Sequence, residues 1–340
     1  MSSSPAPHAF RSACPPAGGH RALVTAPFRG PGLERLRSLA EVILDPWIDQ
    51  SPLRIYSPDQ LAARLLEEKA DILVCEADQC SGPVCELPLV AIASTRGDPT
   101  NVDLAGASAA GIPVLHAPGR NADSVAELTV ALLLAVSRRI LAADRDVRQG
   151  QVFRDGTIPY QRFRAWQVQG RTAGLVGLGA VGKAVRWRLA GLGMEVLSAD
   201  PYSPEATASL DEVLGRADVV SLHAAVTNET LGMIGASQLA RMRDGAIYLN
   251  TARAALHDLD ALVAALQSGK LAGAGLDHFE GEVLPAGHPL LAMDNVVLTP
   301  HIGGTSFDTE VQHSRMIADD LARLLAGERP VHLANPEVLS

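Results

Sequence analysis

The stretch Gly174-Leu-Val-Gly-Leu-Gly-Ala-Val-Gly182 decides the fold of the second half of the chain. Its first residues are apolar, as at the end of a buried strand, and Lys183 to Leu192 after it is typical of a helix. Between strand and helix, Gly177, Gly179 and Gly182 have the spacing G-x-G-x-x-G. Such a loop turns tightly and lets the backbone approach a pyrophosphate at the N-terminus of a helix. We therefore predict a dinucleotide-binding loop here.

Two neighbouring residues distinguish this loop from a nucleoside-triphosphate loop. The latter needs a hydroxyl residue after Lys183 to hold magnesium, and Ala184 has none. A dinucleotide loop needs an acidic residue about twenty positions further on, at the end of the next strand, to bind a ribose hydroxyl. Asp200 closes the strand-like run from Glu195 and meets that requirement, although a simple turn role before Pro201 is an alternative.

Length and composition limit the class of protein. The chain of 340 residues is long enough for two domains, and its net charge of −9 disfavours a nucleic-acid partner. Residues 1–20 are rich in Ser, Pro, Ala and Gly and are expected to form a loose tail rather than a signal peptide. The longest uncharged run near residue 130, Leu128 to Ser137, is too short to cross a bilayer. We expect a cytoplasmic protein without a membrane partner.

The chain's cysteines are Cys14, Cys75, Cys80 and Cys85, and the last three are spaced by five residues. This spacing does not match a zinc site, and no histidine lies close to them in the sequence. We expect buried or free thiols, no disulfide and no metal.

Short apolar runs alternate with helix-like segments along both halves, which predicts an α/β fold of two doubly wound parallel-sheet domains. A long helix is expected to start near Asn121, run past Arg138 and link the domains. A helix over Asp308 to Ala326 is expected to return to the first domain. The NAD-binding Rossmann domain would span 121–305, and a flavodoxin-like substrate domain would combine 1–120 with 306–340. The predicted strands are Arg21 to Ala26, Glu41 to Leu44, Asp71 to Cys75, Leu89 to Ala93, Ile112 to Leu115, Ala173 to Gly177, Glu195 to Ala199, Val219 to His223, Ala246 to Asn250, Gly273 to Asp277 and Val296 to Thr299.

Polar side chains follow five of the six strands in the second half. They are Asp200, His223, the turn Thr251-Ala-Arg253, Asp277 and His301. Ligands of doubly wound sheets bind beyond the carboxyl ends of the strands, so these residues should meet in one crevice. Strand ends are often polar because they face solvent, which would explain Asp200 or His223 alone. That explanation does not cover Arg253 in an apolar turn or His301 in a Pro- and Gly-rich loop.

Several spaced motifs resemble those of the D-isomer-specific 2-hydroxyacid dehydrogenases. They extend over about residues 70 to 326, and within the family the chain is most similar to the phosphoglycerate dehydrogenase-like members. The motifs are Asn101-Val-Asp103, Gly111-Ile-Pro-Val114, Pro118-Gly119, Val125-Ala-Glu127, Asn250-Thr-Ala-Arg253, Gly273-Ala-Gly-Leu-Asp277, Glu282, and Thr299-Pro-His-Ile-Gly-Gly304.

This resemblance implies that His301 is the acid/base, Glu282 its carboxylate partner and Arg253 the cation that binds substrate. Hydride transfer to a 2-keto acid builds charge on the carbonyl oxygen, which an imidazolium within hydrogen-bond reach neutralises. A nearby carboxylate favours that imidazolium, and arginine can grip a carboxylate in two places. His257 and His278 lack the register of this trio, and we expect both to be structural or exposed.

The resemblance also implies the cofactor contacts. Ala180 and Val181 would face the pyrophosphate, Thr251 to Arg253 the nicotinamide half and Asp277 the carboxamide. The carboxylate of Asp200 would repel a 2′-phosphate, so we expect NAD rather than NADP. The full predicted set is Gly177, Gly179, Ala180, Val181, Gly182, Asp200, His223, Thr251, Ala252, Arg253, Asp277, His301, Gly303 and Gly304.

The chain departs from the family pattern at three places. Ala254 follows the arginine where glycine is common, and Val283 follows the glutamate where proline is usual. The substrate loop, Ser94 to Asn101, is also shorter than the family's pattern. Its Arg96, Gly97 and Asp98 amides could still cup a carboxylate, provided that the Asp98 side chain points away or caps the next helix.

The expected activity is therefore NAD-dependent interconversion of a D-2-hydroxy acid and its 2-keto acid, with 3-phosphoglycerate, hydroxypyruvate or glyoxylate as candidate substrates. Alternatives are an NAD(H)-sensing binding protein of the corepressor kind and a sibling enzyme acting on formate or phosphite. The resemblance also implies a homodimer built around Asn121 to Gln149.

Overall fold

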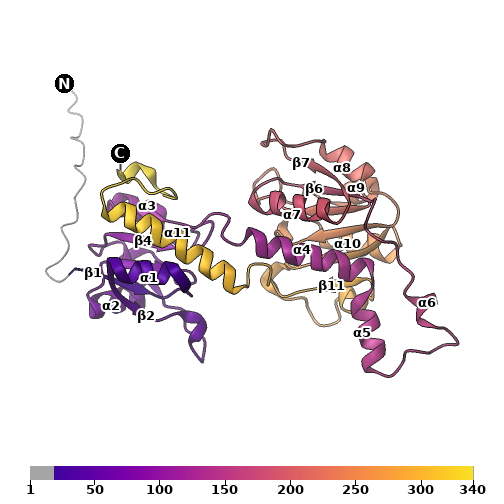
Figure 1. Cartoon of the computed structure of the whole chain (residues 1–340), viewed down its shortest axis with the longest axis horizontal. Coiled ribbons are helices and arrows are strands. Elements are labelled where there is room, and N and C mark those ends of the chain that lie inside the picture. The colour runs from indigo at the N-terminus through magenta and orange to yellow at the C-terminus, as the bar shows by residue number, and fades with distance from the viewer. Residues whose placement is uncertain (1–18, 340) are drawn as a thin grey trace. The chain divides into compact units, whose positions relative to one another are not determined.

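The computed structural model describes residues 19–339, so most of the predicted tail over residues 1–20, and Cys14 within it, lies outside the described residues. The chain divides into two compact units. The first unit joins the chain up to Arg120 with Ser306–Ser340, and the second unit is Asn121–Thr305. Figure 1 labels the helices and several strands of both units.

The first unit is built on a parallel five-stranded sheet in the order β2-β1-β3-β4-β5. This order is that of flavodoxin-like sheets, as predicted. Its strands consist of short, mostly buried runs of Ala, Val, Ile and Leu, which suit a sheet covered on both faces. They are β1 (His20–Val24), β2 (Ala40–Leu44), β3 (Ile72–Cys75), β4 (Ala91–Ser94) and β5 (Val114–Leu115).

Helices cover both faces of this sheet, with separate apolar cores beneath them. One core lies under α1 (Gly30–Leu39) and α11 (Phe307–Leu325), and the other lies under α2 (Pro58–Glu68) and α3 (Leu104–Ala109). The C-terminal helix α11 therefore packs on the first unit, where the Ser314 hydroxyl accepts from the Arg29 amide at 3.0 Å.

The second unit contains a parallel six-stranded sheet in the order β11-β10-β9-β8-β6-β7. Only one strand, β7, follows β6 on its first side before the chain crosses to the other side with β8. In the usual Rossmann order, 3-2-1-4-5-6, two strands precede this crossing. The switch point lies between β6 and β8. The strands are β6 (Thr172–Val176), β7 (Glu195–Ala199), β8 (Val219–Leu222), β9 (Ala246–Asn250), β10 (Leu271–Leu276) and β11 (Val296–Leu298).

Two helical layers enclose the second sheet. The first layer holds α4 (Ala122–Ser137) and α7 (Ala180–Gly191), and the second holds α8 (Leu210–Arg216), α9 (Ala236–Arg241) and α10 (Leu259–Gln267). Figure 1 shows α5 (Ile140–Arg148) and α6 (Pro159–Arg162) extending away from this sheet on a long excursion of the chain. The carboxyl ends of this sheet place the predicted cofactor-binding and acid–base residues in the second unit.

One predicted helix is wrong in its extent. The helix expected to run past Arg138 ends at Ser137, and α5 begins separately at Ile140. Arg139 breaks the helix because its backbone is left-handed, with φ of 53°. Its guanidinium donates to the Arg162 carbonyl at 2.8 Å, which ties the break to α6.

The strand predictions are confirmed to within a few residues at their ends. Cys75, Cys80 and Cys85 are buried free thiols. Within residues 19–339, no helix is both long and apolar enough to span a membrane.

Candidate active site

The glycine loop joins β6 to α7 at the switch point of the second sheet. Gly177 has a φ of 95°, which favours glycine, and a Cβ there would lie 2.5 Å from the Ala224 amide. A Cβ on Gly182 would lie 2.2 Å from the Gly177 carbonyl, so α7 can approach the loop only with glycine. By contrast, a Cβ on Gly179 would meet no protein atom within 4 Å. The loop is therefore packed at its two ends and open in its middle.

This opening faces the start of α7, whose first turn includes Ala180 and Val181. Gly179 is the N-cap and provides no side-chain cap for the helix. The first amides of a helix have no intrahelical acceptor and favour an anion. The predicted pyrophosphate position thus has room and free donors, which fits a dinucleotide.

Asp200 follows β7 and is hydrogen-bonded to the glycine loop. Its Oδ2 accepts from the Leu178 amide at 2.7 Å, and its Oδ1 accepts from the Tyr202 amide at 2.9 Å. The second bond is the turn-forming role considered from the sequence. The first ties the end of β7 to the loop, so Asp200 stands beside the opening in either role.

His223, directly after β8, is buried against the same loop. Its Nε2 lies 2.9 Å from the Ser221 hydroxyl, and its buried Nδ1 has no hydrogen-bond partner among the described residues. Burial lowers the pKa of His223 to about 3, so the imidazole is neutral near pH 7. A neutral, enclosed ring suits packing or hydrogen bonding rather than proton exchange with solvent.

The turn after β9 presents Arg253 to solvent. Asn250 fastens this turn, because its side chain accepts from the Ala252 amide and donates to the Arg253 carbonyl, both at 2.9 Å. The Arg253 guanidinium is exposed and donates to the Ala252 carbonyl at 2.7 Å. Thr251 is buried instead, with its hydroxyl 2.8 Å from that of Thr129 on α4. The turn therefore offers one exposed cation on a fixed backbone.

Asp277, at the end of β10, organises the loop that carries His301. This carboxylate is only 1% exposed. It accepts from the Thr299 hydroxyl at 2.6 Å and from the amides of Ile302 and Gly303 at 2.9 and 2.8 Å. The Asp277 carbonyl also accepts from the His301 amide at 2.9 Å. These bonds hold His301 at a φ of 54°, a left-handed backbone that is uncommon for histidine.

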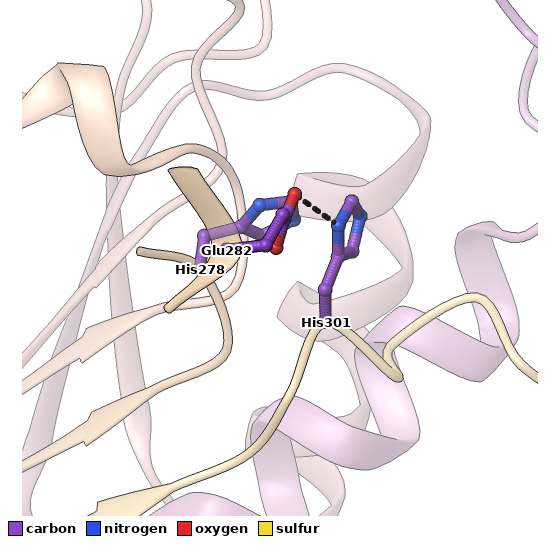
Figure 2. Close-up of side chains that lie close together, drawn as sticks. All are labelled: His278, Glu282 and His301. Carbon is purple, nitrogen blue, oxygen red and sulfur yellow. Dashed lines mark hydrogen bonds and ion pairs between the residues drawn. The ribbon is translucent and has the colours of Figure 1, made fainter. Parts of the chain in front are cut away.

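His301 and Glu282 form the predicted pair. His301 Nδ1 lies 2.9 Å from Glu282 Oε1, with the two side chains 43% and 57% exposed. Glu282 ends a short 3₁₀ turn, η4 (Glu280–Glu282), and also has a positive φ of 62°. Both residues thus keep strained backbones that point their side chains toward one another, as Figure 2 shows.

His278, expected from the sequence to be structural or exposed, is a third member of this cluster. Its ring is 5% exposed, lies 3.6 Å from that of His301 between centroids, and places Nε2 3.4 Å from the Arg253 guanidinium. Burial, helped by the charges of His301 and Arg253, lowers the pKa of His278 to about 4. In the sequence, the spacing of four residues between His278 and Glu282 was the signal that could have placed His278 in this cluster. His257 is structural as expected, buried against Tyr248 and Asn250.

The predicted substrate loop lies in the first unit, after β4. The Ser94 hydroxyl donates to the Asn101 side chain at 2.9 Å and closes the loop. The Arg96 amide points to Ser94, whereas no described residue accepts from the amides of Gly97 and Asp98. Asp98 does not cap the following helix, because Asp103 caps α3.

A family model described as "D-isomer specific 2-hydroxyacid dehydrogenase, NAD binding domain" matches residues 130–303, about half of the chain. The chain is also 36% identical over 322 residues to a glyoxylate reductase of Thermofilum pendens, covering 91% of this chain and 92% of that protein. The chain belongs to the D-isomer-specific 2-hydroxyacid dehydrogenase family.

The chain is similar to two further proteins. A D-3-phosphoglycerate dehydrogenase of Archaeoglobus fulgidus is 38% identical over 235 residues, which are 67% of this chain but 44% of that longer protein. The crystal structure of the TT0316 protein of Thermus thermophilus matches with a TM-score of 0.78 at 38% identity, covering 92% of this chain and 99% of that one.

This dehydrogenase is an NAD-dependent oxidoreductase that interconverts a 2-hydroxy acid and its 2-keto acid. The open glycine loop and the carboxylate of Asp200 fit NAD. Neither the corepressor-like alternative nor a formate or phosphite enzyme is favoured, since the relatives are named as 2-hydroxyacid dehydrogenases and reductases.

Proposed function

We propose that this dehydrogenase reduces a small 2-keto acid, glyoxylate or hydroxypyruvate, to the corresponding 2-hydroxy acid, the D-isomer where the product is chiral, with His301 as the acid. The pair of His301 Nδ1 and Glu282 Oε1 at 2.9 Å carries the proposal. Relatives that match over nearly their whole length are named glyoxylate reductases, which supports a small substrate over 3-phosphoglycerate.

The geometry of the pair assigns a role to each imidazole nitrogen. Nδ1 of His301 donates to Glu282, which leaves Nε2 free to protonate the substrate's carbonyl oxygen. Glu282 orients the ring by accepting from Nδ1. In the oxidative direction, Nε2 takes the hydroxyl proton.

Arg253 is proposed to bind the substrate's carboxylate. Its exposed guanidinium uses one nitrogen on the Ala252 carbonyl, so further donors face solvent. Two parallel N–H bonds to a carboxylate orient a small 2-keto acid and draw electron density from its carbonyl. In the first unit, the amides of Gly97 and Asp98, with the positive charge of Arg96, are proposed as further substrate-binding groups.

NAD, when bound, supplies or accepts the hydride. We propose that Gly177, Gly179 and Gly182 with Ala180 and Val181 hold its pyrophosphate, and that Asp200 binds a ribose hydroxyl. The nicotinamide half would be held by His223, Thr251, Ala252, Arg253, Asp277, His301, Gly303 and Gly304.

We also propose that the second unit acts as the NAD domain, the first unit as the substrate domain, and the active form as a homodimer. Large apolar side chains are exposed over α5 and the segment after it, as an interface requires. Among them, Val147, Phe153, Tyr160 and Trp166 are each at least 67% exposed. Light scattering should give twice the chain mass, and a monomer would refute the dimer. The cytoplasm remains the proposed compartment.

A substrate panel tests the activity. NADH oxidation should be fastest with glyoxylate or hydroxypyruvate, slower with pyruvate and 2-oxoglutarate, and slower with NADPH for every acid. Preference for 3-phosphohydroxypyruvate would overturn the small substrate and favour the phosphoglycerate branch. No oxidation with any acid, despite measured NADH binding, would overturn the activity itself.

A further inference from the structure

The cluster of His278, Glu282 and His301 offers more than the reaction requires. Proton transfer uses only the pair of His301 and Glu282, yet a second imidazole lies against the first. One potential ligand atom from each of the three residues lies within 4.8 Å of the other two. Figure 2 shows the Glu282 carboxylate and the two imidazole rings close together.

We propose that His278, Glu282 and His301 bind one divalent transition-metal ion of the zinc class, and that this ion reversibly inhibits the dehydrogenase. The inhibition rests on the proposed acid–base role of His301, whereas the binding does not.

The donor set suits this ion. Two imidazoles with one carboxylate are a set that zinc enzymes use, and they leave a fourth position open. Imidazole also favours zinc, copper and nickel over magnesium and calcium, which prefer oxygen. In a tetrahedral site with bonds of about 2.1 Å, ligand atoms lie roughly 3.4 Å apart. The cluster is thus within about an ångström or two of the required spacing.

The burial of the three side chains indicates how the site can close. His278 is 5% exposed and held within the fold, so it provides a fixed ligand. Glu282 and His301 are largely exposed and can adjust around an incoming ion from solvent. A bound ion would engage His301 and withdraw Glu282 from it, so the imidazole could no longer deliver a proton.

Arg253 disfavours binding of the ion, which provides a second test of the site. Its guanidinium lies 3.4 Å from His278 Nε2, and a positive charge at this distance disfavours a cation. It is exposed and can turn away, but at some loss of affinity. Replacing Arg253 with glutamine should therefore tighten metal binding about three- to tenfold. Loss of folding cannot produce such a gain.

The experiment measures Zn²⁺ binding to the full chain by competition with a chromophoric chelator, and in parallel the inhibition of NADH oxidation. Losing a residue that hydrogen-bonds to a metal ligand costs about 10–100-fold in metal affinity, so losing a ligand itself should cost at least about a hundredfold. We expect one tight site in the wild type, weakened at least that much in His278→Phe, which keeps an aromatic ring against His301. Inhibition, relative to each variant's own rate without metal, should follow binding.

Two matched controls test specificity. His20 Nδ1 pairs with Asp71 Oδ2 at 2.7 Å in the first unit, which mimics the His301 pair without the second histidine. His20→Gln and Cys14→Ser should leave the tight site unchanged. If either abolishes it, or if His278→Phe binds Zn²⁺ as the wild type does, the proposed site is wrong.

The binding and activity readouts separate the two proposals. Tight binding that depends on His278, in a protein without keto-acid reduction, would support the metal site and overturn the proposed function. Reduction that proceeds unchanged with the site saturated would overturn the inhibition, and reduction without tight binding would overturn the site.

Discussion

Replacing Asp277 with asparagine should disturb both the stability of the second unit and the placement of His301. The buried carboxylate accepts three hydrogen bonds, from the Thr299 hydroxyl and the amides of Ile302 and Gly303. Asparagine can keep the two bonds to Oδ1. Its amide nitrogen then replaces Oδ2 and faces the Gly303 N–H, so one bond is lost and two donors meet.

The magnitude follows from these bonds. A hydrogen bond to a charged group contributes about 1.5–3 kcal/mol, and an unsatisfied buried donor costs about 1–3 kcal/mol. We expect the Asp277→Asn variant to lose roughly 3 kcal/mol of unfolding free energy. For a domain of about 200 residues this lowers Tm by roughly 6–12 °C. Since the His301 backbone depends on the same loop, kcat should fall at least about tenfold, equivalent to about 1.4 kcal/mol.

Calorimetry and steady-state NADH oxidation measure the two effects, and fluorescence titration of NADH shows whether cofactor affinity changes separately. Thr299→Val is the matched control, because it removes a single hydroxyl from the same carboxylate and should cost about 1 kcal/mol. An Asp277→Asn variant with the Tm and kcat of the wild type would refute the claim that this carboxylate holds the loop.

Three further predictions concern the cofactor side. Gly179→Ala should fold normally but weaken NADH binding, whereas Gly182→Ala should lower Tm by several degrees because its methyl group meets the Gly177 carbonyl. Thermal melts and NADH titrations of both variants test this difference. If the two variants have the same Tm and the same NADH affinity, the packing argument is contradicted. Asp200→Ala should narrow the preference for NADH over NADPH, and an unchanged ratio of kcat/KM would mean that the ribose is recognised elsewhere. The pKa of His223 in the fold, about 3, lies below its unfolded value of about 6.5, so the free energy of unfolding decreases as the pH is lowered below about 6.5. The His223→Gln variant should reduce this slope by about 1.4 kcal/mol per pH unit, which urea unfolding at pH 4.5 to 6 can measure. A slope identical to that of the wild type would refute the burial of a neutral ring.

Local patterns were sufficient to predict much of the second unit. The loop from Gly174 to Gly182 has packing and turn requirements that only glycine meets at its two ends. Parallel strands bring their carboxyl ends to one edge, and so the short apolar runs also located the polar residues that follow them. The pairing of His301 with Glu282 was implied by family resemblance, and their contact is present in the structure.

Other features depend on contacts that are distant in sequence. The helix break at Arg139 is held by a hydrogen bond to the Arg162 carbonyl. The sequence around Arg139 contains no glycine or proline that would predict the break. His278 reaches His301 because of the path that the chain takes after Asp277, which the 299–303 loop fixes. The strand order depends on where the chain crosses β6, and strand patterns alone do not specify that crossing.

Proton transfer by His301 is the central claim, and His301→Asn tests it most directly. Asparagine tolerates the left-handed backbone at this position better than alanine does, so the loop should persist. We predict that kcat for glyoxylate reduction falls about 10²- to 10⁴-fold, while the Kd for NADH stays within about twofold of the wild type. Turnover at the wild-type rate with NADH bound would contradict the account.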